Sequence, residues 1–147
     1  MLLEPPGLTP AGPKRLPHWP YLEAVDDALT CRGIPPGKVR IERTGREYGE
    51  RMYIVLAWDV SRTAGLGGIR LHWHEETGWA YAITGANPRI KGPRQPLKPL
   101  LRVFAAPDDV AEVADQIVGE GRRPAGEYGI EWDGANGVRA AIDAFRT

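Results

Sequence analysis

Two histidines placed two residues apart, His72 and His74, are the first candidates for chemistry in this sequence. On a β-strand both side chains would project from the same face, so their imidazoles could share a metal ion with a third ligand such as Asp59 or His18. A complete site of this kind needs a further histidine downstream, and no histidine follows His74. A metal-dependent enzyme using His72 and His74 is therefore an alternative, and a solvated strand face carrying two histidines is the simpler interpretation.

The sequence contains no complete set of residues for nucleophilic or acid–base catalysis. Ser61 is not flanked by the strand–turn–helix elbow that exposes a catalytic serine, and Cys31 lies at the end of a predicted helix, where we expect a buried thiol. Adjacent carboxylates, such as those of Asp26 and Asp27, point apart on a helix or a turn. We therefore expect no enzymatic activity and no cofactor.

A proline-rich connector that follows the aromatic strands carries a run of basic residues. No acidic residue occurs from Thr77 to Pro107, and the basic side chains of this segment are Arg89, Lys91, Arg94, Lys98 and Arg102. These side chains could follow a phosphate backbone, which makes nucleic-acid binding through residues 89–102 a second alternative. The whole chain has 19 basic and 19 acidic residues, so its net charge provides no long-range attraction to a nucleic acid.

The segment from Ile69 to Thr84 predicts a β-hairpin with two different faces. Gly78 can adopt the left-handed conformation that a three-residue hairpin loop requires, and the resulting register pairs Trp73 with Tyr81. The large apolar side chains then share one face, and they are Ile69, Leu71, Trp73, Tyr81 and Ile83. The opposite face is small and weakly basic, with Arg70, His72 and His74 across from Thr84, Ala82 and Ala80.

The preceding segment, residues 52–60, is apolar on both of its sides and predicts a central strand. Its second row is small, so Val55 and Ala57 would extend the surface that Ala80 and Ala82 begin. A low-relief face of this kind allows another chain to approach closely. The predicted partner-binding surface consists of Val55, Ala57, Arg70, His72, His74, Ala80 and Ala82.

This surface makes a non-enzymatic protein-interaction module the preferred interpretation. Such a module would be an adaptor, a chaperone-like protein or an immunity-like regulatory protein that binds through a face or an edge of its sheet. The partner would be another protein or, in a homodimer, a second copy of this chain.

Hydrophobic periodicity predicts an α+β fold with an antiparallel sheet of about four strands, an N-terminal helix and two C-terminal helices. The N-terminal helix begins at Pro20 and stops at Gly33. An edge strand is expected at residues 39–44, and a last strand at residues 100–105. Of the C-terminal helices, the first begins at Pro107. The second is expected to be capped by the side chain of Asp133, with four inward-facing side chains, Val138, Ala141, Ile142 and Phe145.

The domain organisation follows from proline content and from the absence of hydrophobic targeting segments. Six of the first twenty residues are prolines, and this content predicts a flexible arm at residues 1–19 ahead of a single α+β domain at residues 20–147. The first residues lack the basic start and apolar run of a signal peptide, and no segment is long enough to span a membrane. We therefore expect a soluble, cytoplasmic protein without a membrane partner.

Three short motifs give the chain a resemblance to an uncharacterised bacterial domain family of unknown function. They are Pro20-Tyr21 with Ala24-Val25 and Leu29, Glu76-Thr77-Gly78-Trp79, and Pro107-Asp108-Asp109-Val110. The resemblance spans much of residues 20–118. It implies a small α+β protein and brings no activity, cofactor or binding residue with it.

Overall fold

The computed structural model describes residues 16–45, 47, 49–64, 67–84 and 93–147. Its elements are α1 (Trp19–Cys31), β1 (Lys38–Arg43), β2 (Met52–Trp58), the 3-10 turn η3 (Val60–Arg62), β3 (Gly68–His74), β4 (Gly78–Thr84), β5 (Gln95–Pro96), α2 (Pro107–Val118) and α3 (Ala135–Arg146). The strands form one sheet in the order β1-β2-β3-β4-β5, and every neighbouring pair is antiparallel. The predicted α+β class and helix order are confirmed, and the sheet has five strands.

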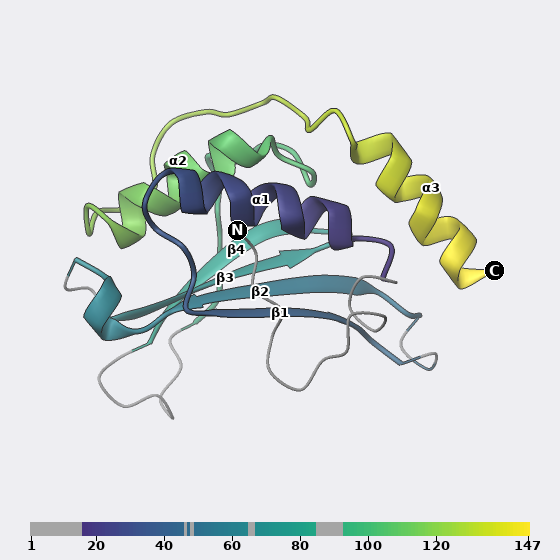
Figure 1. Ribbon diagram of the computed structural model, residues 1–147, viewed down its shortest axis with the longest axis horizontal. Helices are drawn as coiled ribbons and strands as arrows, with labels where there is room; N and C mark the ends of the chain where they lie inside the picture. The colour runs from purple at the N-terminus through teal and green to yellow at the C-terminus, as the bar shows by residue number, and fades with distance from the viewer. Residues whose placement is uncertain (1–15, 46, 48, 65–66, 85–92) are drawn as a thin grey trace.

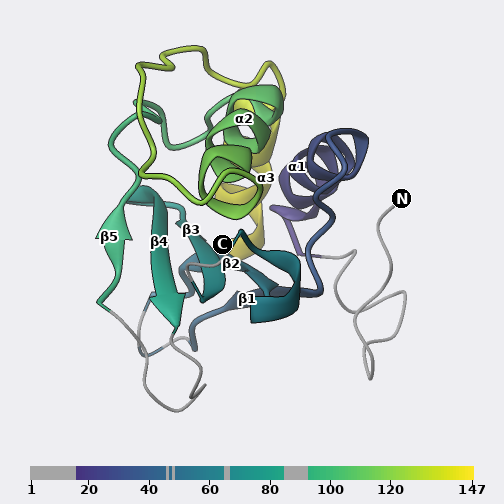
Figure 2. The ribbon, with the colours of Figure 1, turned by 90° about the vertical axis from the view of Figure 1, so that its left-hand side faces the viewer.

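The helices of the described chain all lie on one side of this sheet (Figures 1 and 2). We call the side toward the helices the inner face and the opposite side the outer face. Residues of β2 and β3 alternate between the two faces as strand geometry requires. The inner row of these strands is buried, and it consists of Met52, Ile54, Leu56, Trp58, Ile69, Leu71 and Trp73. The predicted burial of this row is therefore confirmed, as is that of Tyr81 on β4, whereas Ile83 is only partly buried.

An aromatic cluster around Tyr21 joins α1 to the sheet and to the C-terminal half of the chain. The ring of Tyr21 lies 5.1 to 6.1 Å, between centroids, from four other rings, which belong to Trp73, Trp79, Phe104 and Trp132. Its hydroxyl donates to the carbonyl oxygen of Ala105 at 2.7 Å and accepts from the indole nitrogen of Trp79 at 3.0 Å. Burial raises the pKa of Tyr21, so the phenol is a neutral structural group.

The β3–β4 hairpin keeps the predicted faces but not the predicted pairing. Gly78 has a φ of +79°, as expected, yet Trp73 pairs with Trp79 and Leu71 with Tyr81. Every partner is two residues from its predicted position, so each side chain stays on its expected face. A Cβ on Gly78 would lie 3.3 Å from the Cα of Val103, which shows that the loop also packs against a distant segment.

The segment predicted as the last strand, residues 100–105, forms no strand. Only its ends make isolated bridges, Leu100 to Tyr128 and Ala105 to Glu131, and the carbonyl of Val103 accepts a hydrogen bond from the indole of Trp73 at 2.7 Å. Its backbone groups therefore interact with a side chain of β3 and with the loop between α2 and α3. The short strand β5 pairs with β4 in its place.

The last helix, α3, differs from its prediction in cap and in burial. Gly134 occupies the N-cap position and no side chain caps the helix, so Asp133 does not have the expected role. Val138 and Ile142 are buried, but Ala141 and Phe145 are exposed. The helix lies at one end of the molecule (Figure 1), where only a narrow stripe of its surface reaches the core.

Helix α1 has the expected buried stripe and ends before Gly33, whose φ is +84°. The thiol of Cys31 is exposed, so the predicted burial is wrong. Cys31 follows the buried Leu29 by two residues, which turns its side chain roughly 200° around the helix axis. Residues 1–15 of the predicted arm lie outside the described residues and stay a prediction, but residues 16–19 are not a flexible arm, because His18 and Trp19 are buried and Trp19 begins α1. Among the described helices, none has the length and apolar character needed to cross a membrane.

Candidate functional site

The outer face of the sheet carries all the residues predicted to form a partner-binding surface. Strand alternation and register place them together, and they are Val55, Ala57, Arg70, His72, His74, Ala80 and Ala82. Ala82 is buried and the other six are partly buried. No helix of the described chain lies over this face (Figures 1 and 2). The predicted grouping of these side chains on one face therefore agrees with the strand register.

Side chains of the outer face form rows that run across the strands. One row is Lys38, Ala57, Arg70 and Ala82, because each of these residues is the register partner of the next. A second row consists of Arg40, Val55, His72, Ala80 and Pro96. Gln95 pairs with Tyr81, so the preceding residue, Arg94, lies across from Ala82 and extends the first row. This place for Arg94 depends on β5, which the sequence did not predict.

Two adjoining hollows follow these rows and share Arg70. The first, of about 410 Å³, lies over the middle and the hairpin end of the face, with Arg40, His72, Ala80 and Arg94 in its lining. The second, of about 520 Å³, lies over the other end of the face, where it is lined by residues that include Lys38, Ala57, Asp59, Ser61 and Thr84. The small side chains between the cations make the floor of both hollows shallow. The outer face is thus a trough with basic side chains along it.

Charges on the outer face are unequally neutralised. Glu42 accepts hydrogen bonds from Tyr53 and from Arg40, and these two partners hold its pKa below the usual value. No carboxylate among the residues that the structure describes lies within 4.0 Å of the guanidinium of Arg70 or of Arg94. Two arginines of the trough therefore keep their charge available for a ligand.

The carboxylate of Asp59 marks one end of the trough. It accepts hydrogen bonds from the backbone N–H and the hydroxyl of Ser61, and these bonds lower its pKa, with smaller contributions from Arg62 and Lys38. Asp59 is thus the N-cap residue of the short turn η3, with the backbone N–H of Ser61 as its donor, which is a structural role.

The two histidines of the trough are not joined by further metal ligands. Within the described part of the chain, no three side chains of His, Cys, Asp or Glu gather as a metal site would require. The Nδ1 atom of His74 accepts the backbone N–H of Glu76 at 3.1 Å. Asp59 lies at the other end of β2, and His18 lies among buried residues, so neither of the ligands considered from sequence joins the pair.

The basic segment predicted for nucleic-acid binding does not present its described residues on one surface. Arg94 lines the trough, whereas the guanidinium of Arg102 donates to the carbonyl oxygen of Gly129 at 3.1 Å. Lys98 is exposed. Arg89 and Lys91 lie outside the described residues. The described part of this segment thus contributes one cation to the outer face.

A buried histidine, His18, is a feature that sequence reasoning considered only as a metal ligand. Its ring is fully buried and stacks on the indole of Trp73 with centroids 6.0 Å apart. Nε2 lies 3.0 Å from the carbonyl oxygen of Tyr53 and must donate, because a carbonyl only accepts. Burial lowers the pKa of His18 to about 4 despite this bond. His18 is therefore a neutral core residue at physiological pH.

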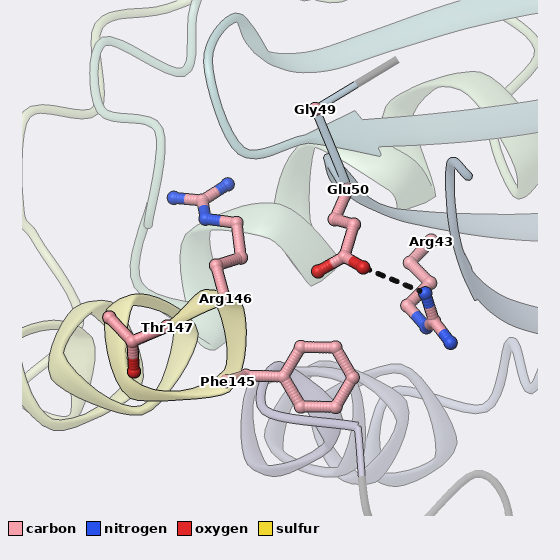
Figure 3. A pocket seen from close by; sticks show the side chains of 6 residues that line it. All are labelled: Arg43, Gly49, Glu50, Phe145, Arg146 and Thr147. Atoms are coloured by element: carbon pink, nitrogen blue, oxygen red, sulfur yellow. Dashed lines mark hydrogen bonds and ion pairs between the residues drawn. The ribbon is translucent and has the colours of Figure 1, made fainter. Parts of the chain in front are cut away.

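Another hollow, of about 530 Å³, lies between the end of α3 and the β1–β2 connection (Figure 3). Arg43 forms an ion pair with Glu50 at 3.5 Å, and its guanidinium lies 5.3 Å from the centre of the Phe145 ring. Glu50 has a φ of +48°, which is unusual for a residue with a side chain. Beside the hollow, Arg146 reaches Glu75 at 2.6 Å. These contacts hold α3 against the sheet. They also pair the charged side chains that line the hollow with groups of the protein itself.

Fold and site together define an α+β protein that has helices on one face of an antiparallel sheet and a basic trough on the other. The chain belongs to a family of unknown function (DUF6292), whose model matches residues 21–116. The predicted resemblance to an uncharacterised domain family is confirmed. All five strands lie within the matched segment, and α3 lies beyond it. No curated protein and no solved structure gives a significant match to the chain.

Proposed function

We propose that this protein is a non-enzymatic binding module that holds a partner protein on the outer face of its sheet. The observation that carries the proposal is the trough itself, in which two hollows meet at Arg70 on a face that no described helix covers. Alanines at positions 57, 80 and 82 keep the floor of the trough low. A partner backbone can therefore approach closely, which favours well-packed contact.

The partner we propose carries acidic side chains, because the trough has more cations than anions. Lys38, Arg40, Arg70 and Arg94 face outward there, against the carboxylates of Glu42 and Asp59. Complementary charge guides the encounter of two proteins and fixes the register in which they dock. The edge strand β1 adjoins this trough, so contacts at the strand edge could extend the same interface.

Site-specific cross-linking tests this proposal in cells that produce the protein. A photoreactive amino acid at Ala80, on the floor of the trough, should cross-link to a partner, whereas the same group at the exposed Ala140 on α3 should not. Mass spectrometry identifies the cross-linked protein, which can then be purified. A cross-link to a second copy of the chain would support the self-association form of the proposal. Absence of a cross-link specific to position 80 would contradict it.

Binding of the purified partner then provides the quantitative test. Ala80→Glu places a carboxylate among the cations of the trough, where it repels an acidic partner, and should weaken binding at least tenfold, while Ala140→Glu makes the same chemical change elsewhere and should leave the affinity unchanged. Unfolding temperatures of both variants show whether the fold is intact. Equal affinity of both variants for the partner would rule out docking on the outer face.

A further inference from the structure

Three basic residues stand at regular intervals across the outer face of the sheet. Lys38 on β1 and Arg70 on β3 are separated by Ala57, and Arg70 is separated by Ala82 from Arg94, which precedes β5. We call Lys38, Arg70 and Arg94 the cation row. Adjacent strands are about 4.8 Å apart, so consecutive members of the row are spaced by about 10 Å at their backbones. The alanines between them have short side chains that rise little above the sheet.

The cations of this row differ in how far the protein already neutralises them. Arg70 and Arg94 have no carboxylate of the described chain within 4.0 Å, and Lys38 has only a minor electrostatic influence on the exposed Asp59. Arg70 is partly buried between the two hollows, while Arg94 and Lys38 are exposed. A guanidinium that is partly buried and unpaired is well suited to a carboxylate, which it can bind through two parallel hydrogen bonds.

We propose, resting on the function proposed above, that the cation row recognises an acidic segment in an extended polyproline II conformation with a carboxylate at every third residue. This conformation has three residues per turn and a rise of about 3.1 Å per residue, so every third side chain returns to the same side after about 9 Å. That interval matches the spacing of Lys38, Arg70 and Arg94. The segment crosses the strands, and its intervening residues lie over Ala57 and Ala82.

A protein segment fits the row better than a nucleic acid does. Glu42 and Asp59 lie on the outer face on either side of the row and would repel a continuous phosphate backbone. The hydroxyl of Tyr53, the aromatic side chain on this face, is held by Glu42, and the large rings of the inner face are buried. The described trough therefore lacks a row of exposed tryptophan, tyrosine or phenylalanine rings on which successive bases could stack.

Peptides of fixed composition test the spacing directly. The probe is a fluorescein-labelled nonapeptide of three Glu-Pro-Pro repeats, and its control has the same residues with the three glutamates consecutive. We expect the repeat peptide to bind at least fivefold more tightly than the control, with an affinity that falls as salt is added. A Lys-Pro-Pro repeat should not bind. Equal binding of the two acidic peptides would overturn the proposed spacing.

Charge variants assign the binding to the row. Arg70→Gln and Arg94→Gln should each weaken binding of the repeat peptide at least fivefold, and Arg123→Gln, which removes an exposed arginine in the loop after α2, should not. Arg94 is exposed, so its variant remains informative even if the Arg70 variant is unstable. Unchanged binding in both row variants would overturn the inference, as would tighter binding of single-stranded or duplex oligonucleotides that depends on the same arginines.

Competition separates this inference from the function on which it rests. If a partner cross-links at position 80 and the repeat peptide displaces it, both proposals are supported. A cross-linked partner that the peptide does not displace would leave the binding module in place and overturn the acidic-segment inference. Peptide binding that depends on Arg70 and Arg94, without any cross-linked partner, would support the cation row and contradict the proposed cellular function.

Discussion

The two faces of the sheet are built from the same strands but carry side chains of different size and charge. The inner face gathers Trp73, Leu71 and their large neighbours against three helices, and the outer face presents Arg70 between two alanines. The strand period of two residues produces both faces from one alternating pattern. Packing in the core constrains the size of residues on the inner face. The outer face has no such constraint from the described helices, so a binding surface can form there.

Substitution of two adjacent residues of β3 should show the largest difference between the two faces. Leu71→Ala removes a fully buried side chain from the inner face and should lower the free energy of unfolding by about 2 to 5 kcal/mol. Arg70→Ala changes a partly buried side chain on the outer face and should alter it by less than about 0.5 kcal/mol. Urea denaturation measures both. Similar losses in the two variants would show that the outer face is also part of the core.

The buried His18 should make the stability of the fold depend on pH. Burial lowers the pKa of His18 from its ordinary 6.5 to about 4, so between these pH values the unfolded chain binds a proton that the folded chain does not. This contribution to stability is complete above pH 6.5 and is lost as the pH falls toward 4, by about 3 kcal/mol in total. Denaturation of wild type across this pH range measures the loss.

A pair of histidine variants identifies the group responsible. His18→Phe should remove this part of the pH dependence, whatever its effect on stability at neutral pH. His74→Gln, on the outer face, should retain it because His18 is still present. A pH profile that is unchanged by His18→Phe would contradict the assignment.

The tyrosines of the two sides provide a smaller test. Tyr21→Phe leaves the indole N–H of Trp79 and the carbonyl of Ala105 without their partner in the core, at a cost of about 1 to 3 kcal/mol. Tyr53→Phe removes a hydrogen bond to Glu42 at the partly exposed outer face and should cost less than about 1 kcal/mol. Thermal unfolding of the two variants side by side gives the comparison, and a larger loss for Tyr53→Phe would reverse it.

Periodicity made the faces predictable, because it depends only on the alternation of side chains along each strand. The pairing of strands was harder to predict from the sequence than their faces. The hairpin register is two residues from its prediction, and the close approach of Gly78 to Val103 is a contact that local sequence does not reveal. Residues 100–105 have the composition of a strand, yet tertiary contacts with Trp73 and with the loop after α2 use their backbone groups.

Some residues of the candidate site could likewise be placed from the sequence, and others could not. The seven outer-face residues follow from alternation, but the place of Arg94 beside Ala82 depends on β5, which begins in a proline-rich segment without a strand pattern. The hollow beside Phe145 depends on where α3 docks, and helix periodicity alone placed that ring in the core. Features made by one element were predictable, and features made where distant elements meet were not.

The exposed thiol of Cys31 has a practical consequence. It is the single cysteine of the chain, and it belongs to the helix layer, on the opposite side of the sheet from the trough. A maleimide or a biotin tether attached there would orient every molecule alike on a sensor chip, with the cationic surface directed toward the solution. The native sequence thus already contains a unique handle for immobilised affinity measurements.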